Sequence, residues 1–122
     1  MEVLSSLEQA VLDTIALHVP EIADALAGQQ GKVRVAARKN TGAGFYTTLD
    51  FAHRLINGVA SPVGRVGATV AGLQHGMGFM LWLREGHIHE LEGYTYGEST
   101  VGIDFERVAF AITFPLNADD DH

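Results

Sequence analysis

The sequence contains no cysteine in 122 residues, and only 19% of its residues are charged. The absence of cysteine excludes a disulfide framework, a thiolate zinc site and a cysteine nucleophile. The charged fraction is below the roughly 25% of an average soluble domain. We therefore expect the fold to depend on its hydrophobic core, and part of its surface to be apolar and to meet another chain.

The sequence also lacks a basic leader and a long hydrophobic run. It begins Met1-Glu2-Val3, and its longest uncharged stretch, 66–83, is interrupted by four glycines and holds Gln74 and His75. Neither feature suits a signal peptide or a membrane-spanning helix. We expect a cytoplasmic protein of bacterial type with no membrane partner.

Hydrophobic residues, in contrast, make up 47% of the chain, which is enough for one core at this length. Domains usually run to about 100–150 residues, so we expect a single domain covering 1–122. The end of the chain, 116–122, holds three consecutive aspartates. We expect it to be a disordered acidic tail.

The charges are segregated along the chain. Residues 1–31 hold five acids and no base, residues 32–84 hold seven bases and one acid, and residues 85–122 hold nine acids and one base. The net charge of −7 disfavours nucleic acid and anionic membranes as partners. We expect the basic middle to pair with the acidic ends, so that a strand presenting Lys32, Arg34 and Arg38 on one face lies near the acids from Glu90 to Glu106.

The first thirty residues have the pattern of a helix. Ser5 and Glu8 form a capping box, and apolar residues then follow at spacings of three or four. Pro20 disfavours helical geometry at Val19, so the helix should kink there, or stop and restart at Pro20.

From Lys32 onward the apolar residues alternate, as they do in half-buried strands. Six segments are strand candidates, separated by glycine-rich turns and by a loop over 53–65: residues 32–38, 45–51, 66–73, 77–84, 88–96 and 108–114. A helix followed by a run of strands predicts the α+β class, with the helix packed on one face of a curved antiparallel sheet of about six strands.

Three segments carry a resemblance: Gly42-Ala43-Gly44-Phe45-Tyr46-Thr47, the stretch 72–79 with the sequence GLQHGMGF, and 91–98 with the sequence LEGYTYGE. With these segments the chain resembles a family of small bacterial proteins that share a C-terminal LEG(Y/F)TYGE motif and have no established function. The resemblance spans 20–115. It implies a shared fold and no catalytic residue.

The position of Glu90 and Glu92 depends on the turn at Glu85-Gly86. A two-residue turn places both carboxylates on the face of Leu81, whereas a three-residue loop places them beside Trp82. In either register Glu90 and Glu92 share one side of the strand.

Glu92 has two interpretations. It can be structural, accepting hydrogen bonds from turn amides or pairing with Arg34 or Arg38. Alternatively, it can contact a ligand or a partner.

Catalytic patterns are weak. His87 and His89 have a spacing compatible with zinc but lack an evident third ligand, and the glycines at 76 and 78 precede a strand, where a phosphate loop needs a helix. The serines and threonines have no nucleophile-elbow context. We therefore expect no metal, no cofactor and no catalytic residue, and we lean against an enzyme.

These observations favour a protein that acts by binding, as a protein-interaction module or a homodimer, with an immunity or inhibitor protein as one form. The alternative is a small-molecule binder or minor enzyme with a pocket between helix and sheet. The candidate binding residues are Tyr46, His75, Trp82, Glu92, Tyr94 and Tyr96.

Overall fold

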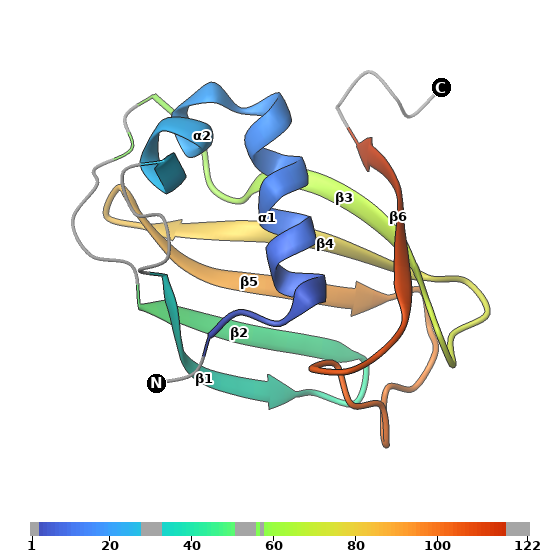
Figure 1. Ribbon diagram of the computed structural model, residues 1–122. Coiled ribbons are helices and arrows are strands. Elements are labelled where there is room, and N and C mark those ends of the chain that lie inside the picture. The colour runs from blue at the N-terminus through green and yellow to red at the C-terminus, as the bar shows by residue number, and fades with distance from the viewer. Residues whose placement is uncertain (1–2, 28–32, 51–55, 57, 117–122) are drawn as a thin grey trace.

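The computed structural model describes residues 3–27, 33–50, 56 and 58–116, with side chains to residue 113. Two helices are followed by six strands: α1 (Ser6–His18), α2 (Pro20–Ala27), β1 (Arg34–Asn40), β2 (Gly44–Asp50), β3 (Val63–Val70), β4 (Met77–Arg84), β5 (His87–Thr95) and β6 (Phe110–Leu116). The strands form one antiparallel sheet in the order β1-β2-β5-β4-β3-β6. Both helices lie on the same face of this sheet (Figure 1). The expected α+β fold is confirmed.

The start of α1 is the predicted capping box. The Ser5 hydroxyl accepts from the amide of Glu8 at 3.1 Å, and the Glu8 carboxylate accepts from the amide of Ser5 at 2.7 Å. Val19 then adopts an extended conformation, as the residue before a proline prefers, and α2 begins at Pro20. The helical segment is therefore split at Pro20.

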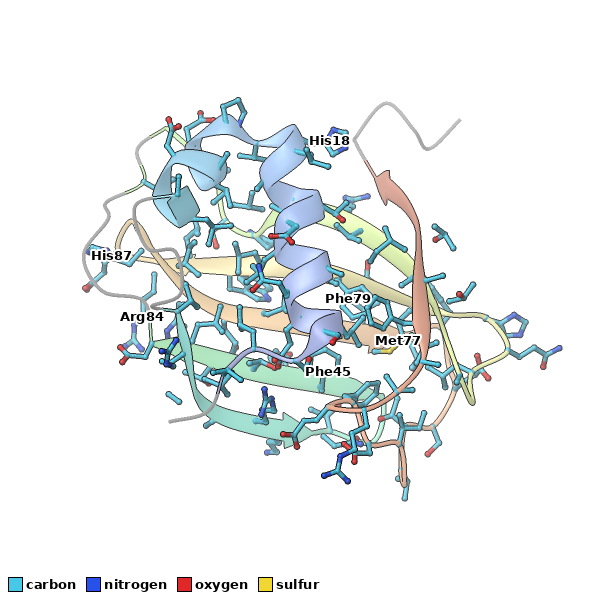
Figure 2. The ribbon with its side chains drawn as sticks, viewed as in Figure 1. His18, Phe45, Met77, Phe79, Arg84 and His87 are labelled. Atoms are coloured by element: carbon cyan, nitrogen blue, oxygen red, sulfur yellow. The ribbon has the colours of Figure 1, made fainter. Side chains whose placement is uncertain are left out.

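The core lies between α1 and the sheet. Leu7, Val11 and Ile15 of α1 are fully buried, as are Phe79 and Leu81 of β4. Figure 2 shows Phe45, Met77 and Phe79 close together beside the N-terminal half of α1. The Phe45 and Phe79 rings are in tilted contact, with centroids 6.0 Å apart. This packing fixes which face of each strand points away from the helices.

The strand boundaries differ from the expected ones at β3. This strand covers Val63–Val70, so it begins inside the segment expected as a loop and ends before Gly72. A register irregularity between Val63 and Val66, with Gly64 at φ +66°, breaks the alternation that would have revealed the strand. At the other end of the chain, Leu116 still belongs to β6, and the rest of the expected tail, 117–122, lies outside the described residues.

The turn between β4 and β5 combines the two registers considered from the sequence. Glu85 and Gly86 both have positive φ, and the turn pairs Leu83 with Ile88 as a two-residue turn does. A bulge then shifts the register, so that Trp82 pairs with Glu90 and Leu81 with Leu91. Glu90 and Glu92 consequently lie on the side of Trp82.

The predicted basic stripe on the first strand is wrong. A bulge between Val35 and Ala37 reverses the alternation, so Arg34 pairs with Asp50 on one face and Arg38 pairs with Thr47 on the other. Arg38 faces α1 and forms an ion pair with Glu106 at 2.9 Å, which confirms the expected contact between this strand and the C-terminal acids. Lys32 lies outside the described residues.

Candidate functional site

The candidate site is the sheet face that points away from the helices, which we call the outer face. Thr47 of β2 donates a hydrogen bond to Glu8 of α1, so this side of β2 faces the helix. Because side chains alternate along a strand, Tyr46 and Thr48 point to the opposite side. The outer face of the four strands β1, β2, β5 and β4 carries Arg34, Ala37, Lys39, Tyr46, Thr48, Asp50, Met80, Trp82, Arg84, Glu90, Glu92 and Tyr94.

These side chains form two rows across the strands. In one row Lys39 pairs with Tyr46, Tyr46 with Glu92 and Glu92 with Met80. In the next row, which we call the Glu90 row, Ala37, Thr48, Glu90 and Trp82 pair in the same way. Directly opposed side chains on neighbouring strands lie close enough to interact, so each row is a continuous surface.

Glu92 lies between two aromatic side chains, Tyr46 on β2 and Trp82 on β4. Its Oε1 accepts a hydrogen bond from Trp82 Nε1 at 2.8 Å, and Tyr46 pairs with Glu92 on the other side of β5. Burial raises the pKa of Tyr46, and the neighbouring Glu92 and Glu90 carboxylates raise it further, so this phenol stays a donor at neutral pH. Glu92 therefore positions Trp82 and lies beside Tyr46, and it accepts a hydrogen bond from an indole where one sequence interpretation expected turn amides or an arginine.

Glu90 has a weaker partner. The hydroxyl that reaches its carboxylate is that of Thr48, at 3.3 Å from Oε2. An ionised carboxylate can accept about four hydrogen bonds, so one long bond leaves most of this capacity for other donors. Half-buried Glu90 also borders a shallow depression of about 530 Å³, whose lining includes Lys39, Tyr46 and Trp82.

Tyr94 lies further along the outer face, on top of Gly78. A Cβ on Gly78 would come within 2.4 Å of the Tyr94 ring, so glycine is required for this ring position. Tyr94 and Tyr96 make an edge-to-face contact with centroids 5.8 Å apart, and burial followed by the Tyr96 hydroxyl raises the pKa of Tyr94. Tyr46, Trp82, Glu92 and Tyr94 thus share one face, and Tyr96 extends it.

His75 belongs to a different part of the molecule. It lies in the loop between β3 and β4, where Glu98 accepts hydrogen bonds from the backbone amides of Gln74 at 2.9 Å and His75 at 2.8 Å. These two hydrogen bonds lower the pKa of Glu98. The role proposed for Glu92, accepting from loop amides, therefore belongs to Glu98.

The proposed pocket between helix and sheet is not formed by the candidate residues, because they lie on the outer face or in the β3–β4 loop. A larger hollow of about 800 Å³ does lie beside the helices, lined mainly by aliphatic side chains that include Leu12, Leu17 and Leu26. Its lining includes Ala27 and Val33, and the residues between these two positions, 28–32, lie outside the described residues. None of the six candidates lines it.

A buried carboxylate on the helix side was missed from the sequence. Glu8 is 3% exposed and accepts hydrogen bonds from Ser5, Arg38 and Thr47. Burial alone would raise its pKa, but the hydrogen bonds and the Arg38 charge outweigh burial, and the pKa of Glu8 lies below its ordinary value. The capping box was the one sequence feature that pointed to Glu8, because it places this side chain at the first turn of α1. It did not indicate that Arg38 would bind the carboxylate.

No described group of three or more histidine, aspartate or glutamate side chains converges as a metal site, and the third ligand for His87 and His89 is not found among them. His53, another histidine of the chain, lies outside the described residues. Within the described segments, neither helix is long and apolar enough to cross a membrane.

No protein-family model, no curated protein and no solved structure matches this chain. The family resemblance carried by the LEGYTYGE segment therefore stays a prediction. The structure does show what its residues do: Gly93 lies where a Cβ would collide with Phe45 and Phe79, Glu92 positions Trp82, and Glu98 binds the β3–β4 loop.

Proposed function

We propose that this protein is an interaction module that binds a partner protein through the outer face of its sheet. The observation that carries the proposal is the arrangement around β5. Glu92 fixes Trp82 on β4 through a hydrogen bond and pairs with Tyr46 on β2, and Trp82 remains 36% exposed. A large aromatic ring held in place at the surface contributes binding area at little cost in conformational entropy.

The two carboxylates beside Trp82 favour a partner with basic side chains at this part of the outer face, whereas Lys39, Arg34 and Arg84 lie towards its edges. Glu90 and Glu92 lie on β5, between β2 and β4, and the hydrogen bonds they accept come from the neutral groups of Thr48 and Trp82. A cationic side chain from a partner would complete the coordination of Glu90, and complementary charge would increase the rate of association.

The expected classes of partner follow from this surface. An immunity or inhibitor protein that covers a basic site on another protein would use such a face, and so would a homodimer that buries the two outer faces against each other. Light scattering separates these two cases, since a dimer has twice the 13.1 kDa of one chain. We propose the heteromeric form, because facing two copies would bring the central carboxylates of both near a shared two-fold axis.

The proposal is tested by capture from a lysate of the native host with three baits. These are the wild type, Trp82→Ala and Leu17→Ala, the last being a control because Leu17 is an 80% exposed apolar residue of α1 on the helix side. Circular dichroism of each bait establishes that it is folded. We expect a stoichiometric protein to bind the wild type and Leu17→Ala and to be lost from Trp82→Ala.

Two results would overturn the proposal. In the first, the captured protein is retained by Trp82→Ala and lost from Leu17→Ala, which would move the interface to the helices. In the second, no protein is captured but a metabolite raises the melting temperature of the wild type, which would favour the small-molecule alternative.

A further inference from the structure

We propose that the depression beside Glu90 receives an arginine side chain of the partner. This inference rests on the proposed function, because it specifies which group of a partner protein the outer face recognises. It starts from the lining of the depression, to which four neighbouring strands contribute: Ala37, Arg38 and Lys39, Tyr46 and Thr48, Glu90, and Trp82. The guanidinium of Arg38 is bound to Glu8 on the helix side of the sheet. Ala37 is the β1 residue in the row that contains Thr48 and Glu90. Its side chain is only a methyl group, which leaves space for the depression.

The acceptor in this depression is Glu90. Its carboxylate is half-buried and holds one long hydrogen bond from Thr48. A guanidinium presents paired N–H groups with the spacing of the two oxygens of a carboxylate, so an arginine can bind it in bidentate fashion. The Thr48 hydroxyl oxygen can accept a further N–H.

The wall of the depression is aromatic and rigid. Trp82 faces Glu90 across the strands, and its indole N–H is bound to Glu92, which fixes the direction of the ring. A guanidinium is planar and weakly hydrated, so it stacks on an indole face while donating its hydrogen bonds in plane. A lysine ammonium has no such plane and holds its hydration shell more strongly, which is why we infer arginine.

Lys39 determines the side from which the arginine of the partner can enter the depression. It lies at the β1 side of the depression and would repel a cation placed beside it. The arginine is therefore expected to enter on the side of Trp82 and Glu90. An acidic or neutral partner residue is expected opposite Lys39.

The single tryptophan provides the readout, because the tryptophan fluorescence of this chain, excited selectively over its three tyrosines, reports Trp82 alone. The probes are three blocked tripeptides, acetyl-Gly-X-Gly-amide, with arginine, lysine or citrulline as X. Citrulline keeps the shape of arginine and removes its charge. We expect saturable changes with the arginine peptide, and at least about tenfold weaker binding by the citrulline peptide, since hydrogen bonds between charged groups are the stronger ones.

Glu90→Gln is expected to reduce the affinity for the arginine peptide about tenfold, while Glu21→Gln, which removes the same charge from α2, leaves it unchanged. Equal binding of the arginine and citrulline peptides, or equal binding by the wild type and Glu90→Gln, overturns the inference. That failure is distinguishable from failure of the proposed function, because loss of the partner from the Trp82→Ala bait would still support a protein-binding outer face.

Discussion

Arg38 of β1 binds both carboxylate oxygens of Glu8 on α1, with Nη2 at 2.8 Å from Oε1 and Nε at 3.0 Å from Oε2. Nη1 of the same guanidinium contacts Glu106 at 2.9 Å. Arg38 thus joins the first helix, the edge strand and the segment before β6. The ion pair between buried Glu8 and Arg38 holds α1 against one face of the sheet. The opposite, outer face is therefore not covered by α1 (Figure 1).

We predict that Arg38→Met destabilises the fold by about 3 kcal/mol, because it leaves the Glu8 charge buried without its cation. Urea unfolding followed by circular dichroism measures the change. Arg84→Met is the matched control, since Arg84 is exposed at the end of β4, and its cost should stay within about 0.5 kcal/mol. Equal costs for the two variants would contradict the role given to the Glu8–Arg38 pair.

The pKa of Glu8 gives a pH dependence. The pKa is lowered in the folded protein, so at mildly acidic pH the unfolded chain binds more protons and stability falls as the pH falls. The contribution of Glu8 is complete above its unfolded pKa, near the ordinary value of 4.5, and is lost as the pH drops through the lower folded value. We predict that Glu8→Gln is less stable at pH 7 and loses less stability between pH 5 and pH 3. A slope identical to that of the wild type would be inconsistent with the lowered pKa.

Tyr94 and Gly78 should be coupled. Gly78→Ala places a methyl group against the Tyr94 ring and is expected to cost about 1–3 kcal/mol by overpacking. In a Tyr94→Ala background the obstacle is gone, and most of that cost should disappear. A double-mutant cycle by chemical unfolding measures the coupling, and purely additive costs would show that Tyr94 does not lie over Gly78.

Glu98 should act locally on the β3–β4 loop. Glu98→Gln weakens the hydrogen bonds from the amides of Gln74 and His75, so their hydrogen exchange should accelerate. Glu85→Gln, in the β4–β5 turn, removes the same charge and should leave these amides unchanged. Unchanged exchange in Glu98→Gln would mean that the loop is held by other contacts.

The elements predicted well from sequence are those governed by local rules. The capping box at Ser5 and Glu8, the interruption at Pro20 and the turn at Glu85-Gly86 each depend on a few neighbouring residues, and each is present in the structure. The alternation of Phe79 and Leu81 with Met80 and Trp82 likewise predicts one buried and one outer face of β4.

Bulges account for what could not be predicted. One extra residue in β1 turned Arg38 toward α1, and one in β5 moved Glu90 beside Trp82, although the turn before it has two residues. A bulge reverses the alternation and leaves little trace in the residue pattern. The pair of Glu8 and Arg38 also joins positions 30 residues apart, beyond any local signal.

The candidate site was predicted in part. Tyr46, Trp82, Glu92 and Tyr94 do come together, since aromatic and acidic residues at alternate positions of neighbouring strands must share a face once the register is set. The sequence predicted that Glu90 shares a side of the strand with Glu92. That Thr48 gives Glu90 one long hydrogen bond could be seen only in the structure. His75 was included on residue type alone, and the structure places it in a separate loop.

The most direct test of the outer face uses the one tryptophan of the chain. Biosynthetic labelling with 5-fluorotryptophan gives one fluorine resonance, at Trp82, which a partner cannot obscure. When the captured partner is added in equimolar amount, the account predicts that this resonance shifts or broadens and that Trp82 becomes protected from solvent. Formation of the complex with an unchanged Trp82 resonance would contradict the proposal that the outer face is the binding surface.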